Sequence, residues 1–453
     1  MNDNKTATDI SNDLAQLLDR LGEPESVAAV AGGWAESMRL MPRDLPVLEP
    51  SAIRFARQFC GLDMHLEQAL LDCARRIAAH QDLRKLAWHA VRRLYECDAA
   101  TDFAAWPKLT SVLGEGEPIT TEGFTAGAGC FALIVGLAMV PRVIAVHGRL
   151  GVAEDVTRAT CRQIACFAGN YRGGSQGRLG LFAKQLYWLR HYTDGRLFRL
   201  GRFEYMLKTL DVGLHLFRDR QTGRHVALAP AGWTYDGHGY ALASGQPAGT
   251  PTPPGHGWTA SLMLTPDCAR GYPIDPAGRV CTQQIELALD RWQLIVKPGD
   301  TVLDLHIPAG DRMPLEACGE SMRNAVEFFA RHFPDQPATA FWCWSWIFGP
   351  MLEEILPASS NLVRFLRQCY LAPVPSNGGS LWFIYLRDVD RTSPPRENSL
   401  QSVVADFLSG GGTWRDACMV YPVDVLPQFG TDPFRSGWET PGTGCAPVAS
   451  GLS

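Results

Sequence analysis

The chain has little lysine and no excess of positive charge. Lysine occurs only at positions 5, 85, 108, 184, 208 and 297, so the basic side chains are overwhelmingly arginine, and the formal net charge of the 453 residues is −5. Such a balance does not provide the excess of positive charge that is typical of proteins that bind nucleic acid or an anionic membrane. We therefore expect neither of them as a partner.

The sequence also lacks paired cysteines and a long apolar run. Its thirteen cysteines are scattered without any Cys-x-x-Cys spacing, which predicts buried cytosolic thiols, with no disulfide framework and no metal site. The first eleven residues are polar and do not resemble a signal peptide. The most apolar run, Cys130–Val140, is too short to span a bilayer and is followed by Pro141. These features predict a cytoplasmic protein.

Length and hydrophobic period divide the chain into domains. A chain of 453 residues is too long for one ordinary core. Residues 11–167 show helical periodicity almost throughout, for example in 69–80 and in 83–98, where Asp82 is a candidate N-cap. The glycine-rich segment 171–180 leads into a predicted helix over 181–192. It matches neither the Walker nor the dinucleotide-binding spacing, so an interdomain linker is preferred over a phosphate contact.

From Arg196 onward the hydrophobic period changes to two. Strands are expected over 197–208, 214–219 and 225–230, with a hairpin turn at 221–223. Residues 243–258 are rich in glycine and proline and predict a loop or lid. The apolar run 381–386 predicts a central strand. The predicted fold class is α+β: a helical domain (11–167), a mixed α/β domain (168–426) and an irregular tail (427–453).

The segment 300–346 has the pattern around which the second domain is organised. Thr301–Pro308 alternates with period two and ends at a loop, 316–333 has helical spacing, and 338–346 is again strand-like. This order of strand, helix and strand predicts a βαβ crossover with parallel strands. Ligands of such units bind at the carboxyl ends of the strands, beside the helix N-terminus. His306 and Ser345 lie at those two ends.

The order of the motifs resembles that of Gcn5-related N-acetyltransferases (GNAT). More closely, residues 14–420 resemble bacterial acyltransferase-domain proteins, which join an N-acyltransferase N-terminal domain to a GNAT-like C-terminal domain. The resemblance is carried by LFRLGRFE (197–204), GYPI (271–274), GDTVLDLHIP (299–308), Glu320-Ser321, Phe328-Phe329, Ser345-Trp346, Ser360-Asn361 and Ser399-Leu400-Gln401.

The resemblance implies transfer of an acyl group from a thioester to an amine. GNAT enzymes usually hold the CoA pyrophosphate on a [Q/R]-x-x-G-x-[G/A] loop after the central strand, whereas this chain has AGDRMPLEA at 309–317. Gly310 is a candidate for a tight turn and Arg312 for a phosphate contact. The donor is therefore expected to be acyl-CoA or the phosphopantetheine of an acyl-carrier protein, and no metal is expected.

Acyl transfer needs a base for the amine, a stabilised oxyanion and a proton for the leaving thiolate. An imidazole ordinarily titrates near neutral pH, which makes His306 the first candidate base. Glu320 is expected to orient His306 or to act itself, and Glu204 is a second candidate base. Ser345 occupies the place of the thiolate-protonating group. Donor contacts are expected from the Ile307 backbone, Ser321 and Trp344. Packing alone also explains Trp344, and Cys343 lacks an obvious catalytic partner.

The leading hypothesis is a GNAT-like N-acyltransferase that acts on a small-molecule amine, in bacterial specialised metabolism. Because the glycine pattern of the pyrophosphate loop is missing, two alternatives stay open. One is a non-catalytic protein that binds an acyl thioester or serves as a scaffold. The other is a GNAT-fold enzyme of another acyl-thioester reaction, such as decarboxylation. Both would keep the fold and change the chemistry at His306.

Overall fold

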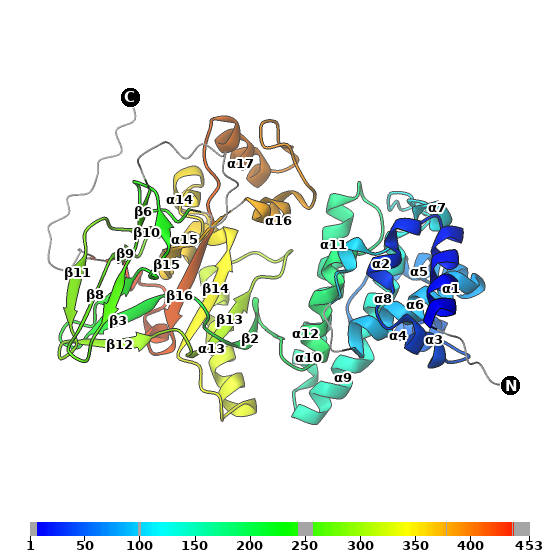
Figure 1. The fold of residues 1–453 in the computed structure, drawn as a ribbon, viewed down its shortest axis with the longest axis horizontal. Coiled ribbons are helices and arrows are strands. Elements are labelled where there is room, and N and C mark those ends of the chain that lie inside the picture. Colours follow the sequence, from blue (N-terminus) through cyan, green and yellow to red (C-terminus); the bar gives the residue numbers. More distant parts are fainter. Residues whose placement is uncertain (1–6, 98–100, 243–256, 377, 437, 439–453) are drawn as a thin grey trace. The chain divides into compact units, whose positions relative to one another are not determined.

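The computed structural model divides into two compact units, 1–200 with 308–310 and 201–307 with 311–453 (Figure 1). It describes all residues except 1–6, 98–100, 243–256, 377, 437 and 439–453. Most of the predicted lid, residues 243–258, lies outside the described part. The division falls at Leu200, later than the predicted boundary after residue 167. The segment 171–180 therefore lies inside the first unit and is not an interdomain linker.

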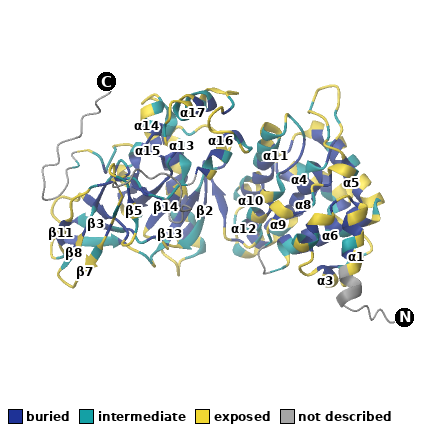
Figure 2. Ribbon diagram, turned by 45° about the horizontal axis from the view of Figure 1, so that its top comes forward, coloured by how far each residue is buried: buried dark blue, intermediate teal, exposed yellow. Residues whose placement is uncertain are grey.

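The first unit is helical, as predicted. Its α-helices are α1 (Ala7–Arg20), α2 (Val27–Val30), α3 (Trp34–Arg39), α4 (Pro50–Phe59), α5 (Glu67–Ala79), α6 (Gln81–Tyr95), α7 (Thr110–Leu113), α8 (Gly129–Leu137), α9 (Met139–Leu150), α10 (Glu154–Cys161), α11 (Gln163–Gly174) and α12 (Arg190–Thr193). Their apolar faces form the core of the unit, which Figure 2 shows as buried. The short strand β1 (Phe198–Leu200) ends the unit.

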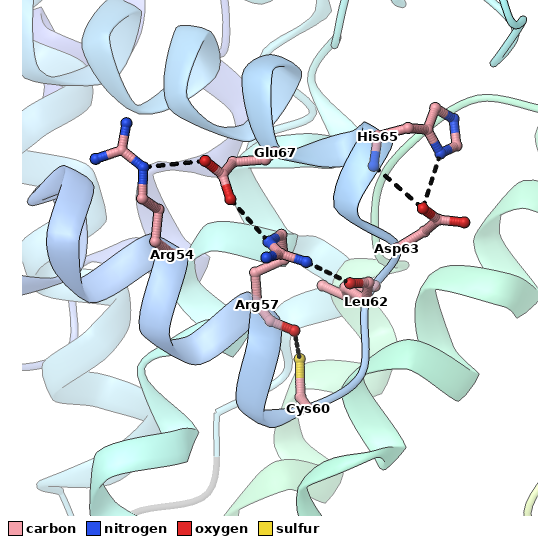
Figure 3. A network of polar contacts seen from close by, with 7 residues as sticks. All are labelled: Arg54, Arg57, Cys60, Leu62, Asp63, His65 and Glu67. Carbon is pink, nitrogen blue, oxygen red and sulfur yellow. Dashed lines mark hydrogen bonds and ion pairs between the residues drawn. The ribbon is translucent and has the colours of Figure 1, made fainter.

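Ion pairs and side-chain caps hold neighbouring helices of this unit together. Glu67 at the start of α5 accepts hydrogen bonds from Arg54 Nε (3.0 Å) and Arg57 Nε (3.1 Å) on α4, and Asp63 caps the turn between the two helices (Figure 3). The predicted cap of α6 is corrected. His80 accepts the hydrogen bond from the Leu83 N–H there, while Asp82 pairs with Arg20 at 2.8 Å.

The apolar run after residue 129 is longer than the sequence pattern indicated. Pro141 lies inside α9, near its start, where a missing N–H costs little. Together α8 and α9 form a stretch, Gly129–Leu150, that is long and apolar enough to cross a membrane. Most of this stretch is buried inside the unit, as is typical of the core helix of a globular domain.

The second unit is built on a mixed sheet with the strand order β2-β13-β14-β16-β15 (Figure 1). The strands are β2 (Phe203–Thr209), β13 (Thr301–His306), β14 (Ala340–Ser345), β16 (Ala417–Pro422) and β15 (Tyr370–Pro373). As predicted, β13 and β14 are parallel and are joined through the long helix α13 (Leu315–His332). The remaining pairs of this set are antiparallel.

Further β-structure is inserted between β2 and β13. One sheet has the order β10-β9-β4-β3-β12 and is formed by β3 (His215–Asp219), β4 (His225–Leu228), β9 (Pro273–Asp275), β10 (Arg279–Val280) and β12 (Trp292–Val296). A smaller sheet is formed by β7 (Leu262–Leu264), β8 (Cys268–Gly271) and β11 (Ile285–Ala288). A further pair is formed by β5 (Thr234–Tyr235) and β6 (Trp258–Thr259). The hairpin turn predicted at 221–223 connects β3 to β4. The Tyr370 hydroxyl on β15 accepts a hydrogen bond from Ala227 N–H on β4 (2.9 Å), which ties the insertion to the main sheet.

Two predicted elements of the second unit are corrected, and two of its strands were not predicted. The run 381–386 is not a central strand; it forms a helical turn with α16 (Trp382–Tyr385) and ends at Leu386, whose φ is +56°. Periodicity cannot separate a short apolar helix from a strand. The predicted strand 197–208 is interrupted between β1 and β2. The strands β15 and β16 were not predicted. In the chain, β15 follows α14 (Leu352–Ile355) and α15 (Asn361–Gln368), and β16 follows α17 (Ser399–Ser409).

Candidate active site

The carboxyl ends of β13 and β14 diverge. The two parallel strands are paired from Val302 with Ala340 up to Asp304 with Trp342. Beyond this point β13 remains paired with β2 as far as His306, and β14 remains paired with β16 as far as Ser345. At its last two residues, β13 therefore has no strand of the described chain paired on the side of β14. Unpaired backbone groups at such an edge are able to bind a ligand.

Three polar side chains share one face of the sheet beside this divergence. Asp304 and His306 are two residues apart on β13, and Glu204 on β2 is directly opposite His306. Side chains two apart on a strand, or opposite each other in an antiparallel pair, lie on the same face, with opposite Cβ atoms roughly 5 Å apart. The Asp304 carboxylate lies 3.3 Å from His306 Nε2. Glu204 is 1% exposed and Asp304 8%, so two carboxylates are buried around the imidazole.

Two tryptophans of β14, Trp342 and Trp344, lie on the same face of the sheet as His306. Trp342 is aligned with Asp304 and is buried, whereas Trp344 is 48% exposed at the end of the strand. The predicted alternation of β14 is therefore present, with Trp342 and Trp344 on the face of His306. Trp344 provides an exposed aromatic surface beside the diverging strands.

Ser345 lies on the other face. Phe341 contacts Tyr205 of β2, with ring centroids 5.9 Å apart, on the face opposite to Asp304 and Glu204. Ser345 shares the face of Phe341 by alternation. Its hydroxyl accepts a long hydrogen bond from the Ile347 N–H (3.5 Å) and caps the turn that follows β14. The structure thus does not bring Ser345 together with His306.

The predicted roles of Ser321 and Glu320 are also corrected. Ser321 on α13 is 1% exposed; its hydroxyl accepts a hydrogen bond from Phe203 N–H (3.1 Å) and lies 3.0 Å from the Tyr205 hydroxyl. It joins the helix to β2 inside the core. Since α13 covers the face of Phe203 and Tyr205, the exposed Glu320 cannot orient His306, which is on the opposite face.

The loop from β13 to α13 has the features expected of a phosphate contact, apart from the glycine pattern. Gly310 has a φ of +103°, which favours glycine, and Arg312 is exposed. Arg202 Nε donates to the Arg312 carbonyl at 3.1 Å and supports the loop. No side-chain hydrogen bond caps the first turn of α13, and the acidic Glu316 in that turn opposes an anion there.

One functional candidate was missed by the sequence reasoning. Asp304 was not among the predicted site residues, yet the alternation that predicts His306 at the strand end also places Asp304 on the same face. The signal was therefore present in the sequence. Among the described residues there is no group of three or more His, Cys, Asp or Glu side chains that could hold a metal ion, and the described cysteines are free.

Comparison with known families identifies both parts of the chain. Residues 54–195 match the N-acyltransferase N-terminal domain, and residues 197–421 match the GNAT-like C-terminal domain. The chain therefore belongs to the GNAT-like acyltransferases that join these two domains, and it is an acyltransferase. Among curated proteins no relative matches significantly.

Solved structures with the same fold include three complexes of acyltransferases. One holds decanoyl-CoA and teicoplanin (21% identity, TM-score 0.56), with coverage of 90% of this chain and 98% of the other. A second holds CoA and 10C-teicoplanin (20% identity, TM-score 0.56), with coverage of 90% and 98%. A mutant acyltransferase in complex with octanoyl-CoA has 20% identity, a TM-score of 0.55 and coverage of 90% and 99%. At this identity the likeness establishes the fold.

Proposed function

We propose that this acyltransferase moves an acyl group from acyl-CoA to the amine of a small molecule. The observation that carries the proposal is the divergence of β13 and β14 beside His306, Asp304 and Glu204. A thioester arm laid between the strands would bring its carbonyl carbon to the strand end where these side chains lie. Structures of the same fold that hold acyl-CoAs support CoA as the carrier, in preference to an acyl-carrier protein.

The backbone at the end of β13 is suited to the developing oxyanion. Successive N–H groups of a strand point alternately to its two edges. The residues from Leu305 to Ile307 therefore present an N–H to the edge that β14 has left, where it donates to the thioester carbonyl. Donors fixed in place before the reaction stabilise an oxyanion without reorganisation. Arg312 and the first turn of α13 would hold the phosphates of CoA, and the Trp344 ring would flank the pantetheine arm.

His306 would act as the general base. The amine nitrogen attacks the carbonyl carbon, a C–N bond forms, and His306 takes the proton that the nitrogen loses. When the tetrahedral intermediate collapses, the C–S bond breaks and its electron pair leaves on sulfur. His306 then returns the proton to the thiolate, directly or through water, so that the products are an amide and free CoA. Glu204, opposite His306, is a second base candidate.

The test is amine acylation followed by mass spectrometry, with release of the CoA thiol measured in parallel. General-base catalysis contributes roughly 10²- to 10⁴-fold, so His306→Ala should lower kcat by about that factor. His238→Ala, at an exposed turn position, is the matched control. Loss of carbon dioxide from the donor would indicate another acyl-thioester reaction. Donor binding without product, across a broad amine panel, would indicate the non-catalytic alternative.

The same proposal covers where the protein acts. The free thiols among the described residues agree with a reducing compartment, which favours the cytoplasm. A small-molecule acceptor in bacterial specialised metabolism is consistent with the teicoplanin that two of the structures with this fold hold. Acylation of protein lysines, in place of small amines, would contradict this part of the proposal.

A further inference from the structure

Arg202 lies just before β2, and the residues on both sides of it are fixed against α13. The preceding residue, Gly201, has a φ of +78°, which residues with a side chain rarely adopt, and a Cβ at its position would lie 3.4 Å from the Ser321 Cβ. The following residue, Phe203, donates its N–H to the Ser321 hydroxyl at 3.1 Å. The backbone of Arg202 therefore has a fixed position beside the helix.

The side chain of Arg202 reaches the loop that leads from β13 into α13. It is buried, with 8% exposed, and its Nε donates to the Arg312 carbonyl at 3.1 Å. Burial raises the pKa of the Cys318 thiol near the start of α13, and the charge of Arg202 opposes that rise. Arg312 is exposed and lies shortly before Pro314, the N-cap of α13. A buried arginine thus fixes the backbone of an exposed one at the start of the helix.

We propose that Arg202 is a positioning residue for the donor: it holds the Arg312 segment so that the Arg312 guanidinium meets the phosphates of CoA. The inference rests on the proposed function, in which Arg312 contacts those phosphates. It also gives a reason why the loop can lack the glycine pattern. A glycine-rich loop binds phosphate on backbone N–H groups that the loop conformation holds in place. Here a side chain beside the neighbouring strand fixes the loop, and a side chain of the loop supplies the charge.

The expected size of the effect follows from conformational entropy. An exposed arginine on an unsupported loop loses backbone and side-chain freedom together when it binds an anion. A hydrogen bond to its carbonyl removes the backbone part of this loss before the donor binds, which is the advantage of a preorganised site. Without Arg202, the contact of Arg312 with phosphate should be largely lost. We therefore expect an effect on CoA affinity similar to that of removing the Arg312 guanidinium, about 3- to 10-fold in Kd.

The first test is a double-mutant cycle on the Kd for free CoA, measured by isothermal titration calorimetry. Arg202→Met keeps an apolar stem and removes the donor, and Arg312→Ala removes the phosphate contact. Each change alone should raise Kd by about 3- to 10-fold. The double variant should bind CoA at most about twofold more weakly than Arg312→Ala, because Arg202 then has no phosphate contact to position.

Arg331→Met, exposed at the far end of α13, is the matched control and should keep the Kd of the unsubstituted protein. Two results would overturn the proposal. One is a Kd in Arg202→Met that stays within about twofold of the unsubstituted protein. The other is a double variant in which the two single effects multiply, because independent sites combine in that way.

The second test separates positioning from structural support. S-acyl-pantetheine carries the same thioester arm as acyl-CoA and lacks its phosphates. In Arg202→Met the KM for acyl-CoA should rise by about 3- to 10-fold. The KM for S-acyl-pantetheine and the kcat with either donor should stay within about twofold. A general disturbance of the helix or sheet would change both donors alike, and that result would contradict the proposal.

Arg202→Lys keeps the test decisive if Arg202→Met does not fold. Lysine retains the charge and the length of the stem, but a methylene takes the place of Nε, so the hydrogen bond to the Arg312 carbonyl is lost. Circular dichroism and the thermal midpoint show whether the fold is kept. The same rise in Kd for CoA is expected, and an unchanged Kd in this folded variant would overturn the proposal.

These measurements also distinguish this inference from the proposed function. If free CoA and acyl-CoA do not bind the unsubstituted protein, the proposed donor is wrong and the inference fails with it. If CoA binds and its affinity depends on Arg312 but not on Arg202, the proposed function stands and this inference alone fails.

Discussion

His89 shows how strongly a single buried side chain is constrained in the helical unit. It is fully buried between Trp34 and Trp106, its Nδ1 lies 2.7 Å from the Ser37 hydroxyl, and its Nε2 lies 2.8 Å from the Val30 carbonyl. Burial is the main cause that lowers its pKa to about 4; the charges of Arg93 and Arg92 act in the same direction, and the Val30 carbonyl opposes the shift. The residue is therefore neutral in the folded protein at physiological pH.

The lowered pKa of His89 predicts acid sensitivity of the fold. The unfolded chain binds a proton near pH 6.5, whereas the folded protein does so only near pH 4, so stability is lost as pH falls from 6.5 to 4. Between pH 7 and pH 5 this residue should remove about 2 kcal/mol of the free energy of unfolding. His225 in the second unit, whose pKa burial also lowers to about 4, should add a similar loss there.

Denaturant midpoints at pH 7 and pH 5 provide the measurement. His89→Gln should be less stable than the unsubstituted protein at pH 7, because the two hydrogen bonds are not reproduced, and should lose less stability on acidification. An unchanged difference between the two pH values would show that His89 does not carry the effect. The exposed His238→Ala serves as control.

At the scale of single residues the sequence indicated which side chains to consider, and their roles at the site stay predictions. His306 and Glu204 were predicted because both sit in the motif segments that surround the central strand, and the structure brings them together. Ser321 and Ser345 were misjudged because a hydroxyl has the same appearance in a sequence whether it binds a ligand or the backbone. Only the packing of α13 on β2 and the alternation along β14 show which faces they occupy.

At the scale of elements, Ser321 provides the sharpest prediction. Its hydroxyl accepts a hydrogen bond from the Phe203 N–H and contacts the Tyr205 hydroxyl in the core. Ser321→Ala leaves these groups without that partner and should cost about 1–3 kcal/mol in the free energy of unfolding. The KM for acyl-CoA should stay unchanged. A raised KM with unaltered stability, measured by denaturation and steady-state kinetics, would restore Ser321 as a donor contact.

The elements themselves were predicted unevenly. The βαβ crossover was predictable because strand, helix and strand follow one another, and each has its own period in the sequence. The strand β16 was not predicted, although it is fully buried and lies between β14 and β15. Its place depends on pairing with β14 across more than 70 residues of chain, which no local pattern specifies.

At the scale of the whole molecule, the boundary between the two units agrees with the matched domains. The first domain match ends at residue 195 and the second begins at 197, close to the division at Leu200. The predicted boundary at 167 was too early, since the sequence reasoning took the glycine-rich segment 171–180 as a linker. The residues from 171 to 174 instead complete α11, and glycine content alone does not exclude a helix end.

The central claim is that acyl-CoA is the donor and binds where β13 diverges from β14. The most direct measurement is the thermal shift of the purified protein against acyl-CoAs of increasing chain length, with free CoA and ATP as controls. At a concentration 100-fold above Kd a ligand stabilises by about 2.7 kcal/mol, which corresponds to a rise of several degrees.

We expect a rise for acyl-CoAs that depends on chain length and exceeds the rise with ATP. In Arg312→Ala the Kd should increase by about 3- to 10-fold, as for the loss of one charge-assisted phosphate contact, whereas Arg331→Ala, exposed at the far end of α13, should behave as the unsubstituted protein. A folded protein whose midpoint is unmoved by every acyl-CoA would contradict the claim.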